Sequence, residues 1–241
     1  MIWFALALAG ALAQAAYSAG AKVLLSRITP ARLAGGSYLV AAVSLAAISL
    51  ARGVPAISPG FFGAVLVTAA INTAATFLLY RALSLSDLSL CMPILSFTPV
   101  FLLVTSFAIL GEVPTVFGLA GICLVAAGSY MLAANGAPGR DSPRAAPFRT
   151  LLSDRGIQFM LIVAFLYSIS VNYDKVVVEK SDPVLGSAVV FGLLAGIFLL
   201  WAAILQFSGK AAAPATRSGK RGDLLPLVAL GLVLTAEAVS V

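Results

Sequence analysis

The stretch from Tyr80 to Leu132 reads YRALSLSDLSLCMPILSFTPVFLLVTSFAILGEVPTVFGLAGICLVAAGSYML. It holds two long apolar runs, separated by the short sequence from Gly111 to Pro114. A helix rises about 1.5 Å per residue, so about 20 apolar residues cross the roughly 30 Å hydrocarbon core of a bilayer. Glycine and proline between the runs indicate the end of one helix and the start of the next. The stretch therefore predicts two membrane-spanning helices joined by a tight turn.

The same pattern repeats along the whole chain. Hydrophobic residues make up 61% of the 241 positions, charged residues make up 10%, and the mean hydropathy is +1.06. An ordinary soluble domain has about a quarter of its residues charged, so the composition excludes a soluble fold. We expect an all-α, polytopic integral membrane helix bundle of about eight helices. Their predicted ranges are 2–25, 33–51, 60–82, 88–110, 114–134, 157–178, 184–206 and 224–241.

Composition also narrows the function. The chain has no histidine, and its two cysteines, Cys91 and Cys123, both lie in apolar runs. It therefore lacks the usual general base, and the cysteine spacing predicts neither a disulfide nor a metal site. The net charge of +6 lies in short segments between apolar runs, which favours contact with a membrane surface over nucleic acid. We expect no enzyme activity, no catalytic set, no metal and no cofactor, and we expect the lipid bilayer as a partner.

A polar segment at residues 135–156 divides the chain into two similar blocks. Pro30 follows Lys22 at the same spacing at which Pro183 follows Lys175. Such internal symmetry is typical of transporters made of inverted repeats, although chance can also produce it. We interpret residues 1–134 as a first repeat of five helices and residues 135–156 as a linker. Residues 157–241 are then a second repeat that is incomplete, as expected of a truncated chain.

Polar side chains inside the apolar runs are the candidates for a transport path, because an unpaired charge in hydrocarbon costs a few kcal/mol or more. Glu237 lies well inside its apolar segment and predicts a site for a cation, an amine or a proton, unless truncation has shifted its helix. For Lys175, a simpler explanation is that the long side chain reaches the lipid head groups. The full set of candidates is Gln14, Tyr17, Asn72, Tyr80, Asn172, Lys175 and Glu237.

Two prolines interrupt the fourth predicted helix. Pro93 and Pro99 each remove a backbone donor and free the carbonyl four residues earlier, which for Pro99 is that of Leu95. A freed carbonyl in a bilayer must find another donor, and Ser96 and Thr98 are close enough in sequence to supply one. We expect a kinked helix that lines the substrate path. The alternative is that proline is simply commoner in membrane helices than in soluble ones.

The stretch quoted at the start resembles the EamA-type drug/metabolite transporter family. In that family an alanine-leucine pair, two prolines, a glycine-glutamate turn and a glycine in the next helix mark the end of a five-helix repeat. The matching residues here are Ala82, Leu83, Pro93, Pro99, Gly111, Glu112, Gly118 and Gly121. The resemblance implies two inverted five-helix repeats and alternating access around a central cavity. Glu112 is expected to lie in the turn, at the membrane interface, with a role in the fold.

We therefore predict a multi-pass transporter of the bacterial inner membrane that exports a small-molecule substrate such as an amino acid, a sugar or a drug-like compound. The alternative is a non-transporting remnant, or a subunit that needs a partner to supply the missing helices. A homo-oligomer also stays open. Lys and Arg concentrate in the connections after the first, third, fifth and seventh helices, which places the N-terminus outside. The resemblance implies that both termini are cytoplasmic, so the orientation stays open.

Overall fold

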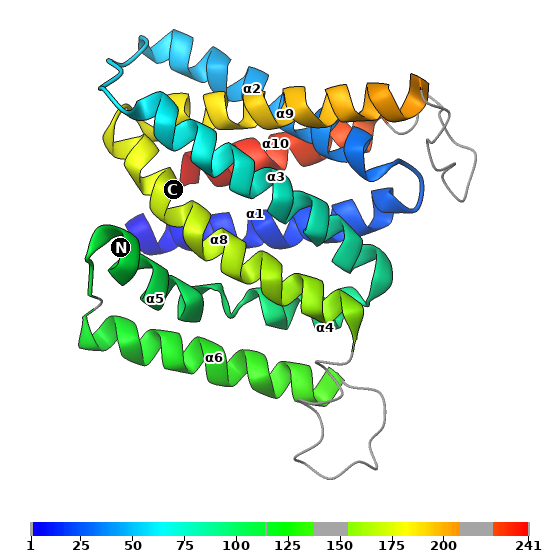
Figure 1. Cartoon of the computed structure of the whole chain (residues 1–241), viewed down its shortest axis with the longest axis vertical. Helices are drawn as coiled ribbons and strands as arrows, with labels where there is room; N and C mark the ends of the chain where they lie inside the picture. Colours follow the sequence, from blue (N-terminus) through cyan, green and yellow to red (C-terminus); the bar gives the residue numbers. More distant parts are fainter. Residues whose placement is uncertain (1, 114, 137–153, 208–223, 241) are drawn as a thin grey trace. The chain divides into compact units, whose positions relative to one another are not determined.

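The structure, a computed structural model, describes residues 2–113, 115–136, 154–207 and 224–240. All regular secondary structure within these ranges is α-helical (Figure 1). The helices are α1 (Ile2–Leu25), α2 (Pro30–Arg52), α3 (Phe61–Leu85), α4 (Leu88–Leu95), α5 (Thr98–Leu110), α6 (Val116–Gly136), α8 (Arg155–Glu179), α9 (Pro183–Phe207) and α10 (Leu224–Ser240). The expected all-α bundle is confirmed.

Among the described residues, six helical segments are long and apolar enough to cross a membrane. They are Ala5–Leu25, Pro30–Arg52, Phe61–Leu85, Leu90–Leu110, Arg155–Glu179 and Pro183–Phe207. Val116–Ser129 and Leu224–Val239 are shorter apolar helices. Each of the eight predicted segments is thus helical, and the chain is a multi-pass membrane protein.

Two helices begin at a proline that lies before the predicted start. We expected the second helix to begin at residue 33 and the seventh at 184, but α2 begins at Pro30 and α9 at Pro183. Proline suits the first position of a helix, because the N–H that it lacks has no intrahelical acceptor there. Pro30 and Pro183 therefore begin their helices, and α1 and α8 end a few residues before them.

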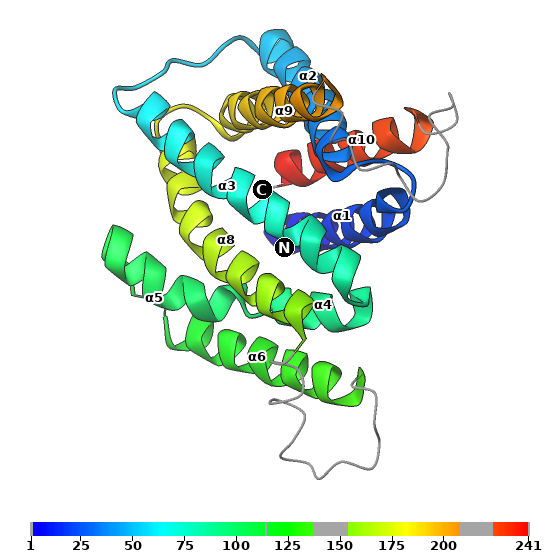
Figure 2. The same ribbon diagram turned by 45° about the vertical axis from the view of Figure 1, so that its right-hand side comes forward.

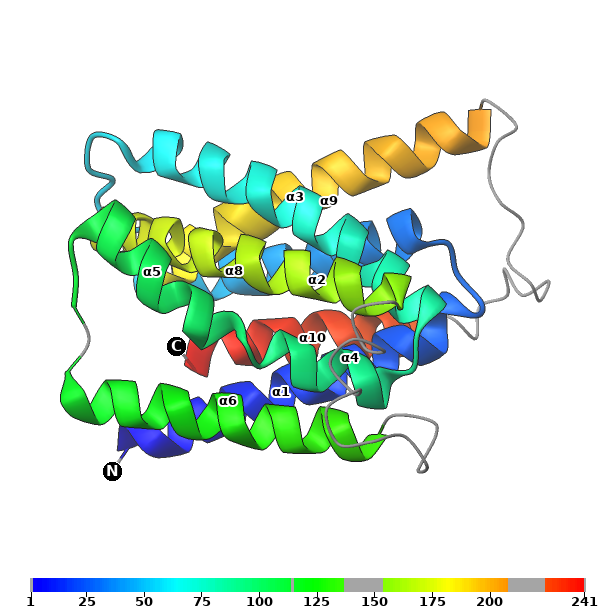
Figure 3. The same ribbon diagram turned by 60° about the horizontal axis from the view of Figure 1, so that its bottom comes forward.

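The chain forms two compact units. Unit 1 comprises residues 1–73 and 173–241, and unit 2 comprises residues 74–172. In unit 1, α2 packs along α9, and α10 packs against α1 and α2 (Figure 2). In unit 2, α6 packs along α4 and α5 (Figure 3). Packing units and sequence repeats divide a chain in different ways, so the predicted repeat boundaries stay a prediction.

Glycines allow α2 and α10 to approach closely in unit 1. A Cβ added to Gly36 would lie 2.7 Å from Leu227 Cδ2. A Cβ added to Gly231 would meet the side chain of Val40 and lie 2.8 Å from the carbonyl oxygen of Ser37. Lipid chains are as apolar as leucine, so membrane helices associate through such close van der Waals packing. The small residues are therefore part of what holds unit 1 together.

An aromatic stack joins α2 to α9. The rings of Tyr38 and Phe191 lie 5.5 Å apart between centroids, at an interplanar angle of 20°. Tyr38 follows Pro30 at the same spacing at which Phe191 follows Pro183. A two-fold relation between the halves would bring equivalent positions of α2 and α9 together in this way. The stack contributes to the packing of α2 along α9, and the duplication stays a prediction.

In unit 2, Asp154 joins the start of α8 to the end of α3. Its Oδ1 accepts hydrogen bonds from the backbone N–H of Gly156 at 2.8 Å and of Ile157 at 3.1 Å, and from the Ser86 hydroxyl. The Ser86 hydrogen bond lowers the pKa of Asp154 below its usual range, and the two backbone N–H groups add to this effect against the opposing effect of burial. Asp154 is thus an N-cap of α8 that also binds Ser86, just after the end of α3.

We expect Gly231→Ala to lower the stability of the protein. Alanine improves helix propensity by about 1 kcal/mol, but overpacking costs about 1–3 kcal/mol, and the Ser37 carbonyl is backbone that cannot move aside cheaply. The control is Gly196→Ala in α9, where a Cβ would meet nothing within 4 Å. Thermal unfolding in detergent should show a lower midpoint for Gly231→Ala only. Equal midpoints for the two variants would contradict the close packing.

We also expect Asp154→Ala to destabilise the fold by about 0.5–2 kcal/mol at neutral pH, because it removes a cap. The pKa of Asp154 is lower in the folded state than in the unfolded state. Ionised Asp154 therefore stabilises the fold fully at pH values above the ordinary pKa range of aspartate. That contribution is lost as the pH falls through the lowered folded pKa. The gap between the wild-type and Asp154→Ala unfolding midpoints should therefore narrow on acidification. A gap that does not change with pH would contradict the ionised cap.

Candidate functional site

Two predicted path residues meet in unit 1. When the Gln14 amide nitrogen is turned towards α10, it donates to Oε2 and Oε1 of Glu237 at 3.1 and 3.2 Å. The hydrogen bonds favour this orientation, because in the reverse orientation the amide nitrogen of Gln14 faces no acceptor. Both side chains are half-buried, and Glu237 is the sole charged residue within α10. The fold thus places a carboxylate from one end of the chain against an amide from the other.

Polar groups continue along α1 beyond Gln14. Tyr17 is buried, with 4% of its surface exposed, and its hydroxyl lies 3.4 Å from the Ser37 hydroxyl of α2. Ser18 is buried as well, and its hydroxyl oxygen finds no hydrogen-bond partner among the described residues. Buried hydroxyls normally have a partner, because leaving one unsatisfied costs about 1–3 kcal/mol. This part of α1 therefore offers an unused hydrogen-bonding group one turn from the Gln14–Glu237 contact.

Asn72 belongs to a second group in unit 1. Its amide donates to Thr68 Oγ1 at 3.1 Å, and the Thr68 hydroxyl donates to Asp174 Oδ1 at 2.5 Å. Thr68 is completely buried, whereas Asp174 is half-buried and the neighbouring Lys175 is exposed. These hydrogen bonds tie α3 to α8. Sequence analysis singled out Asn72 and Lys175 but not Thr68 or Asp174. Thr68 gave no signal, because a single threonine in an apolar run is common.

The remaining candidates lie in unit 2. Asn172, which is 2% exposed, donates to the Ser168 carbonyl at 2.7 Å and to Thr105 Oγ1 at 3.2 Å. The Thr105 hydroxyl also donates to the Ser168 carbonyl at 3.0 Å, so the three groups connect α5 to α8. Tyr80 of α3 is buried, at 1% exposed. Thus Gln14 and Glu237 touch directly, whereas Asn72 and Asn172 bond to residues that sequence analysis did not predict.

The proline-containing span is broken between α4 and α5. The interruption lies where the kink was predicted, since α4 ends at Leu95 and α5 begins at Thr98, and the role of this span in a substrate path stays a prediction. Thr98 donates its hydroxyl to the Leu95 carbonyl at 2.6 Å, as expected from the sequence, and Ser96 donates to the Met92 carbonyl at 3.2 Å. The Thr98 hydroxyl thus satisfies the carbonyl that Pro99 leaves without a backbone donor, whereas the Met92 carbonyl also accepts from the backbone N–H of Ser96.

A turn connects α5 to α6. Gly111 has a φ of 71°, in the left-handed region, and its N–H bonds to the Phe107 carbonyl at 3.0 Å. Glycine adopts this conformation without strain, which explains its place at the end of the helix. Glu112 follows it and is exposed. The predicted glycine-glutamate turn is therefore confirmed.

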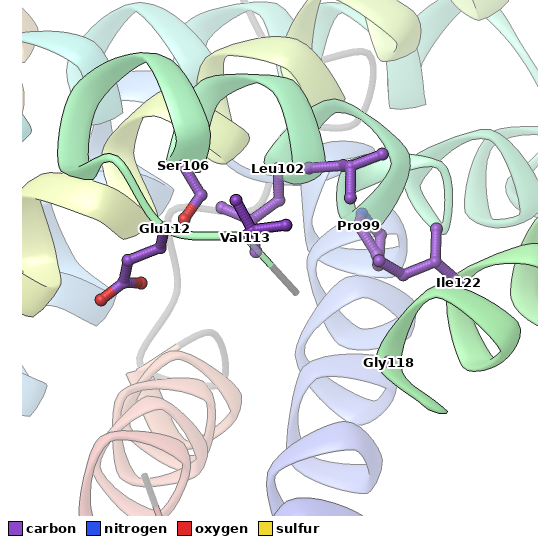
Figure 4. Close-up of a pocket in the computed structure, with 8 residues that line it drawn as sticks. Pro99, Leu102, Ser106, Glu112, Val113, Gly118 and Ile122 are labelled. Atoms are coloured by element: carbon purple, nitrogen blue, oxygen red, sulfur yellow. The ribbon is translucent and has the colours of Figure 1, made fainter. Parts of the chain in front are cut away.

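A pocket of about 620 Å³ lies beside this turn in unit 2, between α5 and α6 (Figure 4). Its volume is in the range of small-molecule sites. It brings together three residues of the sequence motif, Pro99, Glu112 and Gly118. The lining residues are Pro99, Leu102, Leu103, Ser106, Glu112, Val113, Gly118 and Ile122. Within the described ranges, no three His, Cys, Asp or Glu side chains are placed to hold a metal ion.

Comparison with known proteins supports both the fold and the family. A solved structure titled "Crystal structure of protein" matches 98% of this chain and 77% of its own, with a TM-score of 0.67 and 17% identity. At that identity the likeness shows the fold alone. No curated protein matches the chain.

The model of the EamA-like transporter family matches residues 1–134, which is more than half of the chain. This match covers the stretch whose prolines, glycine-glutamate turn and following glycines carry the resemblance seen in the sequence. The resemblance is therefore confirmed, and with it the general function of a membrane transporter of the drug/metabolite superfamily. The chain belongs to the EamA-like transporter family.

Proposed function

We propose that this transporter exports a small metabolite across the bacterial inner membrane by alternating access, and that the Gln14–Glu237 contact lies on its path. The observation that carries the proposal is a carboxylate placed among apolar helices and held by a neutral amide from another helix. A charge at membrane depth is costly and is typical of substrate or ion pathways. The family match indicates the transport function, and the Gln14–Glu237 contact is our candidate for a binding site on the path.

The contact offers a simple way to couple binding to movement. With its nitrogen turned towards α10, the Gln14 amide donates to both carboxylate oxygens of Glu237. A cation, an amine or a proton that binds Glu237 would displace this amide and remove a hydrogen bond between α1 and α10. A ligand shifts a conformational equilibrium only through a difference in its affinity for the two states. Competition with Gln14 provides such a difference.

The break between α4 and α5 provides the second element of the proposal. A helix that is interrupted can tilt on one side of the break without stretching hydrogen bonds on the other. Asn172 and Thr105 fix α5 against α8 in the state that the structure shows. We assign Asn172 this role of positioning α5, in addition to the predicted role in lining the path. Tyr17, Asn72, Tyr80 and Lys175 remain predicted path residues.

The first test measures flux through Glu237 variants. A screen of amino acids, sugars and nucleosides for export from cells that express the chain identifies a substrate. Glu237→Gln should then lower flux about tenfold, which is about 1.4 kcal/mol, without loss of membrane insertion. Glu179→Gln is the control, because it removes an exposed carboxylate at the end of α8. We expect Asn72→Ala and Tyr80→Phe to change substrate range or flux. Normal transport by the Glu237, Asn72 and Tyr80 variants together would overturn the path.

The second test separates the two roles of Asn172. A double-mutant cycle of Asn172→Ala and Thr105→Ala should give a coupling energy of about 0.6 kcal/mol, the average for hydrogen bonds between membrane helices. The measurement is reversible unfolding of the purified protein in mixed detergent micelles. A coupling of zero, together with altered flux in Asn172→Ala, would show that Asn172 acts on the substrate and not on α5.

A further inference from the structure

We propose that the pocket between α5 and α6 binds a membrane phospholipid whose head group carries a primary ammonium, such as phosphatidylethanolamine. The pocket lies wholly within unit 2 and includes none of the seven polar side chains that are the candidates for the transport path. The proposal therefore does not depend on the transport path.

The position of the pocket along α5 matches the depth profile of a lipid. Pro99 lies inside the apolar span Leu90–Leu110, whereas Glu112 lies beyond its end. At about 1.5 Å per residue, the helix between them covers roughly 16 Å, about half the hydrocarbon core. One end of the pocket is thus at the depth of the head groups, and the other is at the depth of the acyl chains.

The chemistry of the lining follows the same division. Ser106 and Glu112 lie together at one end of the pocket, whereas Pro99 and Ile122 lie at the other (Figure 4). Leu102, Leu103 and Val113 add further apolar surface. The apolar end suits an acyl chain, and the polar end suits a cationic head group with hydrogen-bond donors.

The carboxylate of Glu112 discriminates among lipid head groups. A primary ammonium offers three N–H donors and a positive charge, which suit a carboxylate. A trimethylammonium group, as in phosphatidylcholine, has no N–H to donate. Phosphatidylglycerol carries a net negative charge, which Glu112 repels. Charge and hydrogen bonding together therefore favour the ethanolamine head group.

The surroundings of the pocket point to the bilayer as the source of the ligand. The first turn of α6 exposes large apolar side chains, with Val116 at 80% and Phe117 at 91% exposed, and Leu124 farther along the helix is 76% exposed. Surface of this kind in a membrane protein is covered by lipid chains. A lipid can therefore enter the pocket sideways, with its head group at Glu112 and the rest of its chains in the bilayer.

The test measures which lipid stays bound to the purified full chain. The protein in detergent receives an equimolar mixture of phosphatidylethanolamine, phosphatidylcholine and phosphatidylglycerol with identical acyl chains, and native mass spectrometry counts the retained lipids. We expect enrichment of phosphatidylethanolamine. Glu112→Gln should lower that enrichment about fivefold, which is about 1 kcal/mol, whereas Glu179→Gln, which removes an exposed carboxylate elsewhere, should leave it unchanged.

A second pair of variants tests the pocket itself. Gly118→Leu adds a side chain to a residue that lines the pocket, and should reduce retention of phosphatidylethanolamine. Gly121→Leu, nearly one turn farther along α6 where a Cβ meets nothing within 4 Å, should not. Thermal unfolding confirms that each variant is folded, and Gly118→Ala replaces Gly118→Leu if the latter is not.

Two results would overturn the proposal. Equal retention of the three phospholipids by the wild-type protein would exclude recognition of the head group. Binding of dodecylamine that is sensitive to Glu112→Gln, without enrichment of phosphatidylethanolamine, would assign the pocket to a free amphiphilic amine and not to a lipid.

Discussion

The need to satisfy every backbone N–H and C=O within the hydrocarbon underlies the rest of the structure. Apolar runs of about 20 residues meet it by forming helices, in which each peptide group bonds within its own segment. The same requirement applies to the backbone carbonyls at the break between α4 and α5. Prolines remove donors there, and the hydroxyls of Ser96 and Thr98 donate to carbonyls of the preceding turn. The Thr98 hydroxyl thus gives the Leu95 carbonyl the donor that Pro99 lacks.

Once the backbone is satisfied, little apolar driving force remains to hold one helix against another, because lipid is as apolar as the helices themselves. Close contact at glycine and a small number of polar contacts provide the association. Gly36 and Gly231 allow α2 and α10 to meet, and the Asn172–Thr105 hydrogen bond joins α5 to α8. Some of these contacts, such as Gln14–Glu237, include a charged side chain, and it is there that we propose a ligand competes with the amide.

The sequence was sufficient to predict the helices, because the length of an apolar run is a strong signal in a membrane protein. It was insufficient for the helix starts at Pro30 and Pro183, since proline indicates either a break or a first position. It identified Gln14 and Glu237 as unusual but not as neighbours, because their contact depends on how α1 packs against α10. Thr68 and Thr105 escaped notice, since a lone hydroxyl in an apolar run has no distinctive spacing. Their importance comes from the partners that tertiary packing supplies.

The two compact units share α3 and α8, and neither helix contains a proline. Each therefore keeps its ladder of backbone hydrogen bonds across the point where one unit ends and the other begins. An intact helix resists bending, whereas the neighbouring span of α4 and α5 has a joint. The helices α3 and α8 are thus rigid, and the break between α4 and α5 is the point at which bending is easiest.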